Sequence, residues 1–321
     1  FGIGFIDNKE TWYLENACGH HWLACRIPND KYFVTGNQSR FRDYDPKDND
    51  NFLADKKLLS FAEENGLWNP AEGKFDFHKA YSKDDIADHT YNYTRVWGLQ
   101  QLFTPSMVQD VNVNNFPVYA KPDSGHIGIR ELRKAFRFHY DGTEHDPYLH
   151  NNGHEPWRPV SIFRTTQTHL LQVRPWLPDA IGHITYVANG MADLGVFLPI
   201  YQGVKSFPKA YQIGDNHCSN DSAYWKFRKV MTLAMTNYNA YASLVKETYA
   251  KLEAENDQRQ KEFEAKYLAI YKKCPMEAQD MLQNFSDAML NHALDVAEKL
   301  TLELFTRLTE DTMKNYMFHG A

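Results

Sequence analysis

Asn37 is the residue near the start of the chain with the clearest chemical potential, because it directly follows an apolar run and a glycine in Tyr32-Phe-Val-Thr-Gly-Asn37. That position predicts an amide that projects from a strand end at the rim of a sheet. A carboxamide there offers a neutral N–H donor for an oxyanion, with no proton to gain or lose near neutral pH. The alternative is a turn asparagine that caps its own backbone, and the residues alone leave both interpretations open.

A histidine-rich segment forms a second group with metal-binding residue types. It combines nitrogen and oxygen ligands of the kind that hold zinc or manganese: His139, His145, His150, His154, Asp141, Glu144, Asp146 and Glu155. No pair of them is fixed four residues apart on an expected helix, and loops rich in Pro, Asn and Gly commonly carry solvated histidines. We therefore expect no metal and no other cofactor. A metal-dependent hydrolase that uses residues 139–154 is kept as an alternative.

The four cysteines, Cys18, Cys25, Cys218 and Cys274, form no C-x-x-C pair and have no regular spacing. This pattern argues against a disulfide scaffold and against a cysteine zinc site. Cys18 and Cys25 are near enough in sequence to pair across a hairpin, but free thiols are the favoured interpretation. The sequence also lacks the G-x-S-x-G, H-E-x-x-H and G-x-x-x-x-G-K-[ST] motifs of serine hydrolases, zincins and P-loop proteins.

Composition narrows the classes of partner. The 321 residues are 43% hydrophobic and 14% aromatic, which is enough material for a packed core. Thirty-five basic and 41 acidic residues give a net charge of -6, without a basic run that would follow a phosphate backbone, so no nucleic-acid partner is expected. No stretch approaches the roughly 20 apolar residues of a membrane-spanning helix, so no membrane partner is expected either.

The order of expected elements indicates an α+β protein. Strands are predicted at 1–6, 11–15, 20–27 and 32–36 as an antiparallel meander, and again at 160–163, 168–174, 183–188 and 196–201. Helices are predicted at about 53–65, 83–103 and 128–139, and long helices follow residue 222. We expect one domain over 1–215 and a helical region over 216–321 that packs on it or builds a homo-oligomer interface.

The first residues already resemble a strand and contain no initiator methionine. We therefore expect further sequence upstream of Phe1. Any export signal would lie in that segment, so the compartment, cytoplasmic or exported, stays open.

Several blocks follow one another along nearly the whole chain in an order that resembles a known family. They include Glu10-Thr-Trp-Tyr-Leu-Glu15, Phe136-Arg-Phe-His-Tyr-Asp-Gly-Thr-Glu-His-Asp-Pro147 and Pro156-Trp-Arg-Pro-Val-Ser-Ile-Phe-Arg164, with further blocks at 19–40, 168–172, 197–203 and 221–228. Together these blocks resemble the dipeptidases of peptidase family C69, within the N-terminal nucleophile hydrolase superfamily. Secernins and, more distantly, penicillin and bile-salt acylases share that architecture.

The resemblance implies an αββα sandwich of antiparallel sheets and hydrolysis of dipeptides. The nucleophile of that family is a cysteine made N-terminal by removal of preceding residues, and its own α-amino group relays the proton. Phe1 has no nucleophilic atom, and Cys18 and Cys25 lie inside the expected meander. We therefore expect the nucleophile upstream of this sequence and no turnover by this fragment alone. A non-catalytic, secernin-like binding protein is the alternative.

Two residues match the superfamily's catalytic positions. Asn37 stands where an asparagine at a strand end helps to form the oxyanion hole. Arg164 resembles an arginine beside the nucleophile in the acylase branch, where a guanidinium lowers the thiol pKa or holds a substrate carboxylate. A structural ion pair is the alternative role for Arg164.

The remaining candidates concern substrate binding. The resemblance and the meander together suggest these as pocket residues: His20, His21, Trp22, Arg40 and Arg158. Histidines and tryptophans in strands are commonly packing residues, and the two arginines have the same structural alternative as Arg164.

Overall fold

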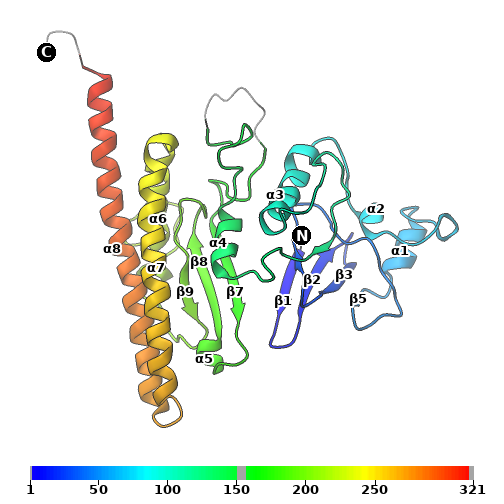
Figure 1. Cartoon of the computed structure of the whole chain (residues 1–321), viewed down its shortest axis with the longest axis horizontal. Coiled ribbons are helices and arrows are strands. Elements are labelled where there is room, and N and C mark those ends of the chain that lie inside the picture. Colours follow the sequence, from blue (N-terminus) through cyan, green and yellow to red (C-terminus); the bar gives the residue numbers. More distant parts are fainter. Residues whose placement is uncertain (1, 150–156, 318–321) are drawn as a thin grey trace. The chain divides into compact units, whose positions relative to one another are not determined.

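The computed structural model describes residues 2–149 and 157–317, and its contacts divide the chain into two compact units (Figure 1). Unit 1 comprises 1–131, 139–147 and 152–160, and unit 2 comprises 132–138, 148–151 and 161–321. Helix α4 (Ile129–Arg137) contributes residues to both units. Among the described residues no helix is long and apolar enough to cross a membrane.

Unit 1 is built on a four-stranded antiparallel sheet in the order β1-β2-β3-β5. The strands β1 (Gly2–Ile6), β2 (Thr11–Asn16) and β3 (Trp22–Ile27) confirm the predicted meander. The fourth strand, β5 (Phe52–Ala54), lies where the start of a helix was expected. The predicted strand at 32–36 is shorter than expected: β4 (Tyr32–Phe33) pairs with β6 (Tyr119–Ala120) in a separate two-stranded sheet.

The helices of unit 1 are short. They are α1 (Leu58–Glu64), the 3₁₀ turn η1 (Pro70–Glu72), α2 (Phe77–Tyr81), the π-helical turn η2 (His89–Tyr93) and α3 (Thr94–Phe103). Helix α1 stops at Asn65-Gly66 as predicted, since Gly66 adopts a φ of 66° that other residues rarely take. One face of the sheet and these helices share a core of Leu23, Cys25, Phe41, Leu58, Ala62, Phe75 and Phe77.

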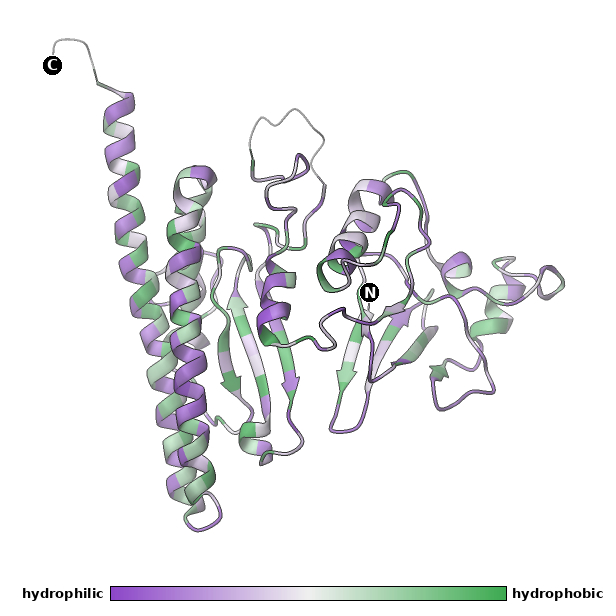
Figure 2. Ribbon diagram, in the orientation of Figure 1, coloured by the Kyte–Doolittle hydropathy of each residue, from purple (hydrophilic) through white to green (hydrophobic). Residues whose placement is uncertain are grey.

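Unit 2 combines a second antiparallel sheet with three long helices. The sheet contains β7 (Gln167–Val173), β8 (His183–Asn189) and β9 (Leu198–Tyr201), with α5 (Asp179–Gly182) between the first two strands and η3 (Lys209–Gln212) after the third. The long helices are α6 (Ala223–Met235), α7 (Tyr238–Ile270) and α8 (Pro275–Asn315), which lie beside the sheet in Figure 1. Figure 2 shows polar and apolar residues mixed along α7 and α8, as expected for helices that bury one stripe.

Buried charge links the elements of unit 2. Glu253 of α7, 5% exposed, lies 2.6 Å from Arg137 Nη2 and also accepts the backbone N–H of Phe197 at 2.8 Å. Arg133 makes a two-point contact with Asp257, one turn further along α7. A bidentate guanidinium–carboxylate pair has a fixed geometry, so these contacts define how α4 lies against α7.

The α+β class is confirmed, whereas the prediction of a strand at 160–163 was wrong. Residues 160–166 form a turn and not a strand, and β7 begins at Gln167. The charged stretch 253–266 lies inside the continuous helix α7, in the region predicted to be helical. The αββα sandwich and the domain boundary at 215 stay predictions.

Candidate functional site

Asn37 lies in a bend four residues beyond β4, with its side chain exposed and its backbone anchored. Its backbone N–H donates to Oδ1 of Asn92 at 2.7 Å. Its own Oδ1 accepts from Nη2 of Arg95 at 2.8 Å, and the same nitrogen donates to Asn92 Oδ1 at 2.9 Å. Asn37, Asn92 and Arg95 therefore form one hydrogen-bonded cluster at the junction of η2 and α3.

The contact with Arg95 fixes which way the Asn37 amide points. A guanidinium has donors but no acceptor, so the atom that faces it must be the amide oxygen and not the nitrogen. The Nδ2 group is thereby turned away from Arg95, and it has no hydrogen-bond partner among the residues that the structure describes. An exposed amide N–H₂ with a fixed direction is the arrangement required of an oxyanion donor.

Asp88 anchors the cluster through a hydrogen bond to Asn92. Its carboxylate, 8% exposed, accepts from Asn92 Nδ2 at 2.5 Å and from the backbone N–H of Asp85 at 3.1 Å. Gly36 allows the close approach, since a Cβ there would lie 2.8 Å from Asn92 Oδ1. The π-helical turn η2 places Asp88 and Asn92 at its two ends, and such turns are frequent at functional sites.

Arg158 lies at the same turn. Its backbone N–H donates to Thr90 O at 3.0 Å, and its guanidinium lies 4.0 Å from the ring centre of Tyr91. The backbone carbonyl of Arg158 accepts from the hydroxyl of Tyr140, which adopts an unusual φ of 65°. Arg95 also lies over the Tyr91 ring, at 5.2 Å, so Asn37, Arg95 and Arg158 all lie close to η2.

The candidate substrate-binding residues His20, His21 and Trp22 lie at the turn between β2 and β3. His20 is exposed, Trp22 begins β3, and both Trp22 and His21 are half-buried. His21 Nδ1 lies 2.6 Å from Asp55 Oδ1, and this contact holds the pKa of Asp55 below its usual value. The His21 ring also packs against Phe61 at 4.3 Å. Their proposed role in substrate binding stays a prediction.

Arg40 is 3% exposed, and its guanidinium donates to the carbonyl oxygens of Phe116 and Pro117, both at 2.9 Å. Burial lowers its pKa to about 10. Its backbone N–H donates to Glu15 Oε1 at 2.9 Å, and Glu15 also accepts from the Ser39 hydroxyl. The Arg40 guanidinium thus donates to backbone carbonyl oxygens and not to a carboxylate, and its proposed role in substrate binding stays a prediction.

Arg164 lies in the turn before β7, in unit 2. Its side chain is exposed and makes no hydrogen bond or ion pair with any residue of the described ranges. The structural ion pair considered as its alternative role is therefore not formed within those ranges. The guanidinium stands open to solvent.

The histidine-rich segment is described in part, because His150, His154 and Glu155 lie outside the described residues. His139 is 1% exposed, and its two ring nitrogens face carboxylates, Nε2 toward Asp141 at 2.8 Å and Nδ1 toward Asp146 at 3.1 Å. His145 stacks on Trp157 with ring centres 3.7 Å apart. The Nε2 atom of His139 and the Asp141 carboxylate are close enough to serve as ligands of the same ion, so the alternative of a metal-dependent hydrolase stays a prediction.

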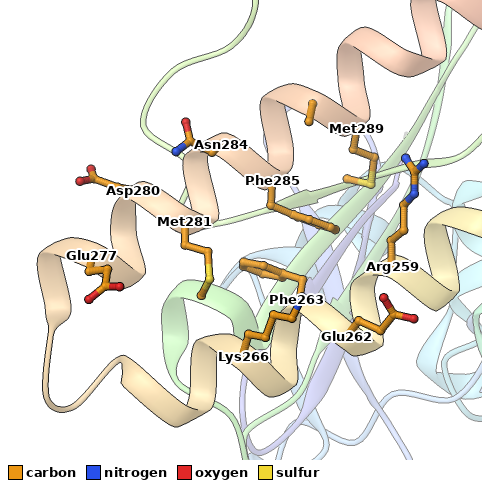
Figure 3. A pocket seen from close by; sticks show the side chains of 11 residues that line it. Arg259, Glu262, Phe263, Lys266, Glu277, Asp280, Met281, Asn284, Phe285 and Met289 are labelled. Atoms are coloured by element: carbon orange, nitrogen blue, oxygen red, sulfur yellow. The ribbon is translucent and has the colours of Figure 1, made fainter.

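A groove of about 690 Å³ lies between α7 and α8 of unit 2. Figure 3 shows Phe263 and Phe285 face to face between the two helices, with ring centres 4.2 Å apart. Charged groups such as Glu262 and Lys266 stand at its edge. The described residues that line it include no cysteine, serine or threonine, so it offers no thiol or hydroxyl nucleophile.

The four cysteines are free thiols. Cys18, Cys218 and Cys274 are exposed, whereas Cys25 is buried in the core of unit 1. Burial raises the pKa of the Cys25 thiol, which opposes the thiolate form that a nucleophile needs.

Comparison with known proteins decides the family. A family model described as "Peptidase family C69" matches residues 1–251. The chain belongs to peptidase family C69. The resemblance drawn from the sequence blocks is thereby confirmed.

Curated relatives carry consistent names. The chain is 52% identical over 217 residues to a "Probable dipeptidase" of Salmonella dublin, a match that covers 67% of this chain and 49% of the relative. It is 29% identical over 244 residues to a "Probable dipeptidase" of Latilactobacillus sakei, covering 75% and 51%. With "Dipeptidase A" of Lactobacillus helveticus it shares 28% identity over 309 residues, covering 94% and 64%. The chain thus spans about half the length of the first relatives it matches.

Within this C69 chain, the residues that sequence reasoning missed are Asp88, Asn92 and Arg95. All three fall in the expected helix 83–103, where they lie four and three residues apart. That spacing places the three polar residues on one face of a helix that also contains apolar residues such as Val96 and Phe103. A polar stripe of this kind was the available signal.

Proposed function

We propose that the protein to which this C69 sequence belongs is a dipeptidase, a thiol-dependent hydrolase in which the Asn37 amide stabilises the oxyanion. Membership of a peptidase family and relatives named as dipeptidases support the substrate class. The observation that carries the role of Asn37 is the orientation of its amide, whose oxygen is bound by Arg95 and whose nitrogen is exposed.

In this proposal the nucleophile is a cysteine outside the printed sequence. Its thiolate forms a bond to the carbonyl carbon of the dipeptide, and the C=O electron pair moves onto the oxygen. Asn37 Nδ2 donates to that oxygen while it carries negative charge. The α-amino group of the same cysteine then protonates the leaving amine as the C–N bond breaks, and water hydrolyses the thioester.

Arg164 is proposed to bind a carboxylate of the substrate. The exposed guanidinium without a described partner supports this role, because a bidentate carboxylate contact would use donors that nothing else occupies within those ranges. His20, His21, Trp22 and Arg158 are proposed as further substrate contacts.

Substitution of Asn37 tests the proposal. Asn37→Ala in the complete, mature protein should reduce kcat for a dipeptide such as Ala-Ala by roughly 10²–10³-fold, because one oxyanion donor is lost. The midpoint of thermal unfolding should change little, since the removed amide is exposed. Steady-state kinetics and calorimetry provide the two readings.

Asn115→Ala is the matched control, because Asn115 is an exposed asparagine of the same unit. Its kcat should equal that of the wild type. An unaltered kcat in Asn37→Ala would remove Asn37 from the mechanism.

A further inference from the structure

We propose that Arg95 is a positioning residue, which holds the Asn37 amide in its donating orientation and polarises it. The inference rests on the proposed role of Asn37 and adds the device that makes that role possible. Nothing in the sequence motifs singles out Arg95. Arg95 makes three hydrogen bonds, has no carboxylate partner among the described residues, and contacts the exposed Asn37.

The first step is the anchoring of the guanidinium itself. Nε of Arg95 donates to the carbonyl oxygen of Tyr91 at 2.8 Å, one turn earlier in the helix. Nη2 divides its two hydrogens between Asn37 Oδ1 at 2.8 Å and Asn92 Oδ1 at 2.9 Å. A planar group held at Nε has little freedom at Nη2, so the direction of the bond to Asn37 is fixed by the helix.

The second step concerns the alternative orientation of the amide. An exposed carboxamide rotates about its last torsion with two broad preferred positions, which exchange its oxygen and nitrogen. In one position Asn37 presents an N–H donor outward, and in the other it presents an oxygen that would repel an oxyanion. Arg95 stabilises the first position with a charge-assisted hydrogen bond and opposes the second, where two donors would face each other.

The third step concerns charge. Among the described residues Arg95 has no carboxylate partner, whereas the arginines Arg26, Arg42, Arg133, Arg137, Arg174 and Arg307 all have one. Its side chain is half-buried, and burial lowers the pKa of the guanidinium. Besides the carbonyl oxygen and the ring of Tyr91, the positive charge faces the two amide oxygens. Withdrawal of electron density from the Asn37 amide makes its N–H a stronger donor.

The network behind Arg95 keeps it aligned. Asn92 receives the Asn37 backbone N–H and the Arg95 N–H on the same oxygen, and its nitrogen is bound by the buried carboxylate of Asp88. A flip of Asn92 would lose all three contacts. The orientation of the exposed amide is therefore determined by a buried carboxylate through Asn92 and Arg95.

The test compares Arg95→Gln and Arg95→Lys with Arg26→Gln as control, each in the complete, mature protein with Ala-Ala as substrate. Arg26 belongs to the same unit and pairs with Glu10 at 2.9 Å on the sheet. We expect Arg95→Gln to lower kcat by about tenfold or more, with KM changed less than about threefold, because the group acts on the transition state through Asn37. Arg95→Lys should retain an intermediate kcat, since lysine keeps the positive charge but lacks the planar set of N–H donors of a guanidinium.

A double substitution separates positioning from a general effect on structure. In the Asn37→Ala background, Arg95→Gln should cause no further loss of kcat beyond about twofold, because its target is gone. Losses that multiply would overturn the inference. Should Arg95→Gln fail to fold, Arg95→Lys decides instead, and an unaltered kcat there would overturn it.

Substrate choice distinguishes positioning from direct substrate contact. If Arg95 bound the substrate's carboxylate, Arg95→Gln would raise KM for Ala-Ala and leave the kinetics of Ala-Ala amide unchanged, which would contradict the proposal. An unaltered kcat in Asn37→Ala refutes the oxyanion role itself. A loss in Asn37→Ala with wild-type kcat in Arg95→Gln refutes the positioning role alone.

Discussion

Asn37 illustrates how a single exposed side chain acquires a defined direction. Its amide oxygen is bound by Arg95, and its backbone N–H is bound by Asn92. Arg95 can only donate, so the opposite orientation of the Asn37 amide loses this hydrogen bond. The backbone contact with Asn92 fixes the position of the residue. Preorganisation of this sort is what an oxyanion donor requires, because no reorganisation is then needed as charge develops.

The cysteines within this sequence provide a prediction at the same scale. If the nucleophile lies outside the printed sequence, Cys18→Ser and Cys25→Ala in the complete protein should each retain kcat within about twofold. Cys25→Ala should also lower stability by roughly 1 kcal/mol, because Cys25 belongs to the core of unit 1. A fall in kcat of about 10³-fold in either folded variant would place the nucleophile in this chain.

Sequence reasoning identified Asn37 from an apolar run followed by Gly36, and the structure gives that glycine a packing reason. It did not identify Arg95 or Asn92, because their roles depend on a contact 55 to 58 residues away in sequence. Arg40 shows the converse difficulty. An arginine in a matching block is equally compatible with a pocket and with the buried backbone contacts that the structure shows.

At the scale of elements, Glu15 ties strand β2 to the segment that follows Asn37. Its carboxylate is 5% exposed and accepts from the Ser39 hydroxyl and from the backbone N–H groups of Arg40 and Phe41. Burial is the largest influence on Glu15 and raises its pKa above the usual value of 4.5. The segment 39–41 is therefore held by a carboxyl group whose ionisation is opposed by burial.

This shift predicts a pH dependence of stability. A carboxyl whose pKa is raised by folding binds more protons in the folded state, so its contribution is fully present below pH 4.5 and falls as the pH rises through the folded pKa. The free energy of unfolding of the wild type, relative to Glu15→Gln, should thus decrease above pH 4.5. Denaturant unfolding between pH 4 and pH 8 measures the difference.

Glu10→Gln is the matched control for loss of a carboxyl, because Glu10 is more than one-third exposed and pairs with Arg26 at the surface. A difference between wild type and Glu15→Gln that rises with pH would mean that the contacts with Ser39, Arg40 and Phe41 outweigh burial. That outcome would contradict the account of this segment.

Predictions of elements succeeded where a pattern is local. The strands β1 to β3 and β7 to β9 alternate or concentrate β-branched and aromatic residues, and they occur near the predicted positions. Helix α1 began later than expected because Leu53 pairs in β5, a long-range contact that helical spacing does not reveal. The turn η2 was predicted as ordinary helix, since a π-helical turn has no distinct sequence period.

At the scale of the whole molecule, the order of sheet, helices, sheet and long helices was predictable, and so was the α+β class. The sequence did not predict that the strands of the second sheet join the long helices in one compact unit. The reason lies in side chains such as Glu253, Glu264 and Tyr201, which pair α7 with the strands and the connecting segments across large sequence separations. Such pairs are visible only in three dimensions.

Function was predictable from the sequence only through the family resemblance. Composition argued against a nucleic-acid partner but named no reaction, whereas the matching blocks pointed to peptidase family C69, which the comparison confirmed. The chain spans about half the length of the first relatives. The identity of the nucleophile must therefore be determined by experiment.

The measurement that tests the central proposal most directly is the N-terminal residue of the mature protein, read by mass spectrometry of the natively expressed polypeptide. The account predicts a cysteine at that position, with Asn37 and Arg95 downstream in the same chain. A mature protein that begins with a residue lacking a nucleophilic side chain would contradict the thiol mechanism, and a secernin-like binding role would then be the better explanation.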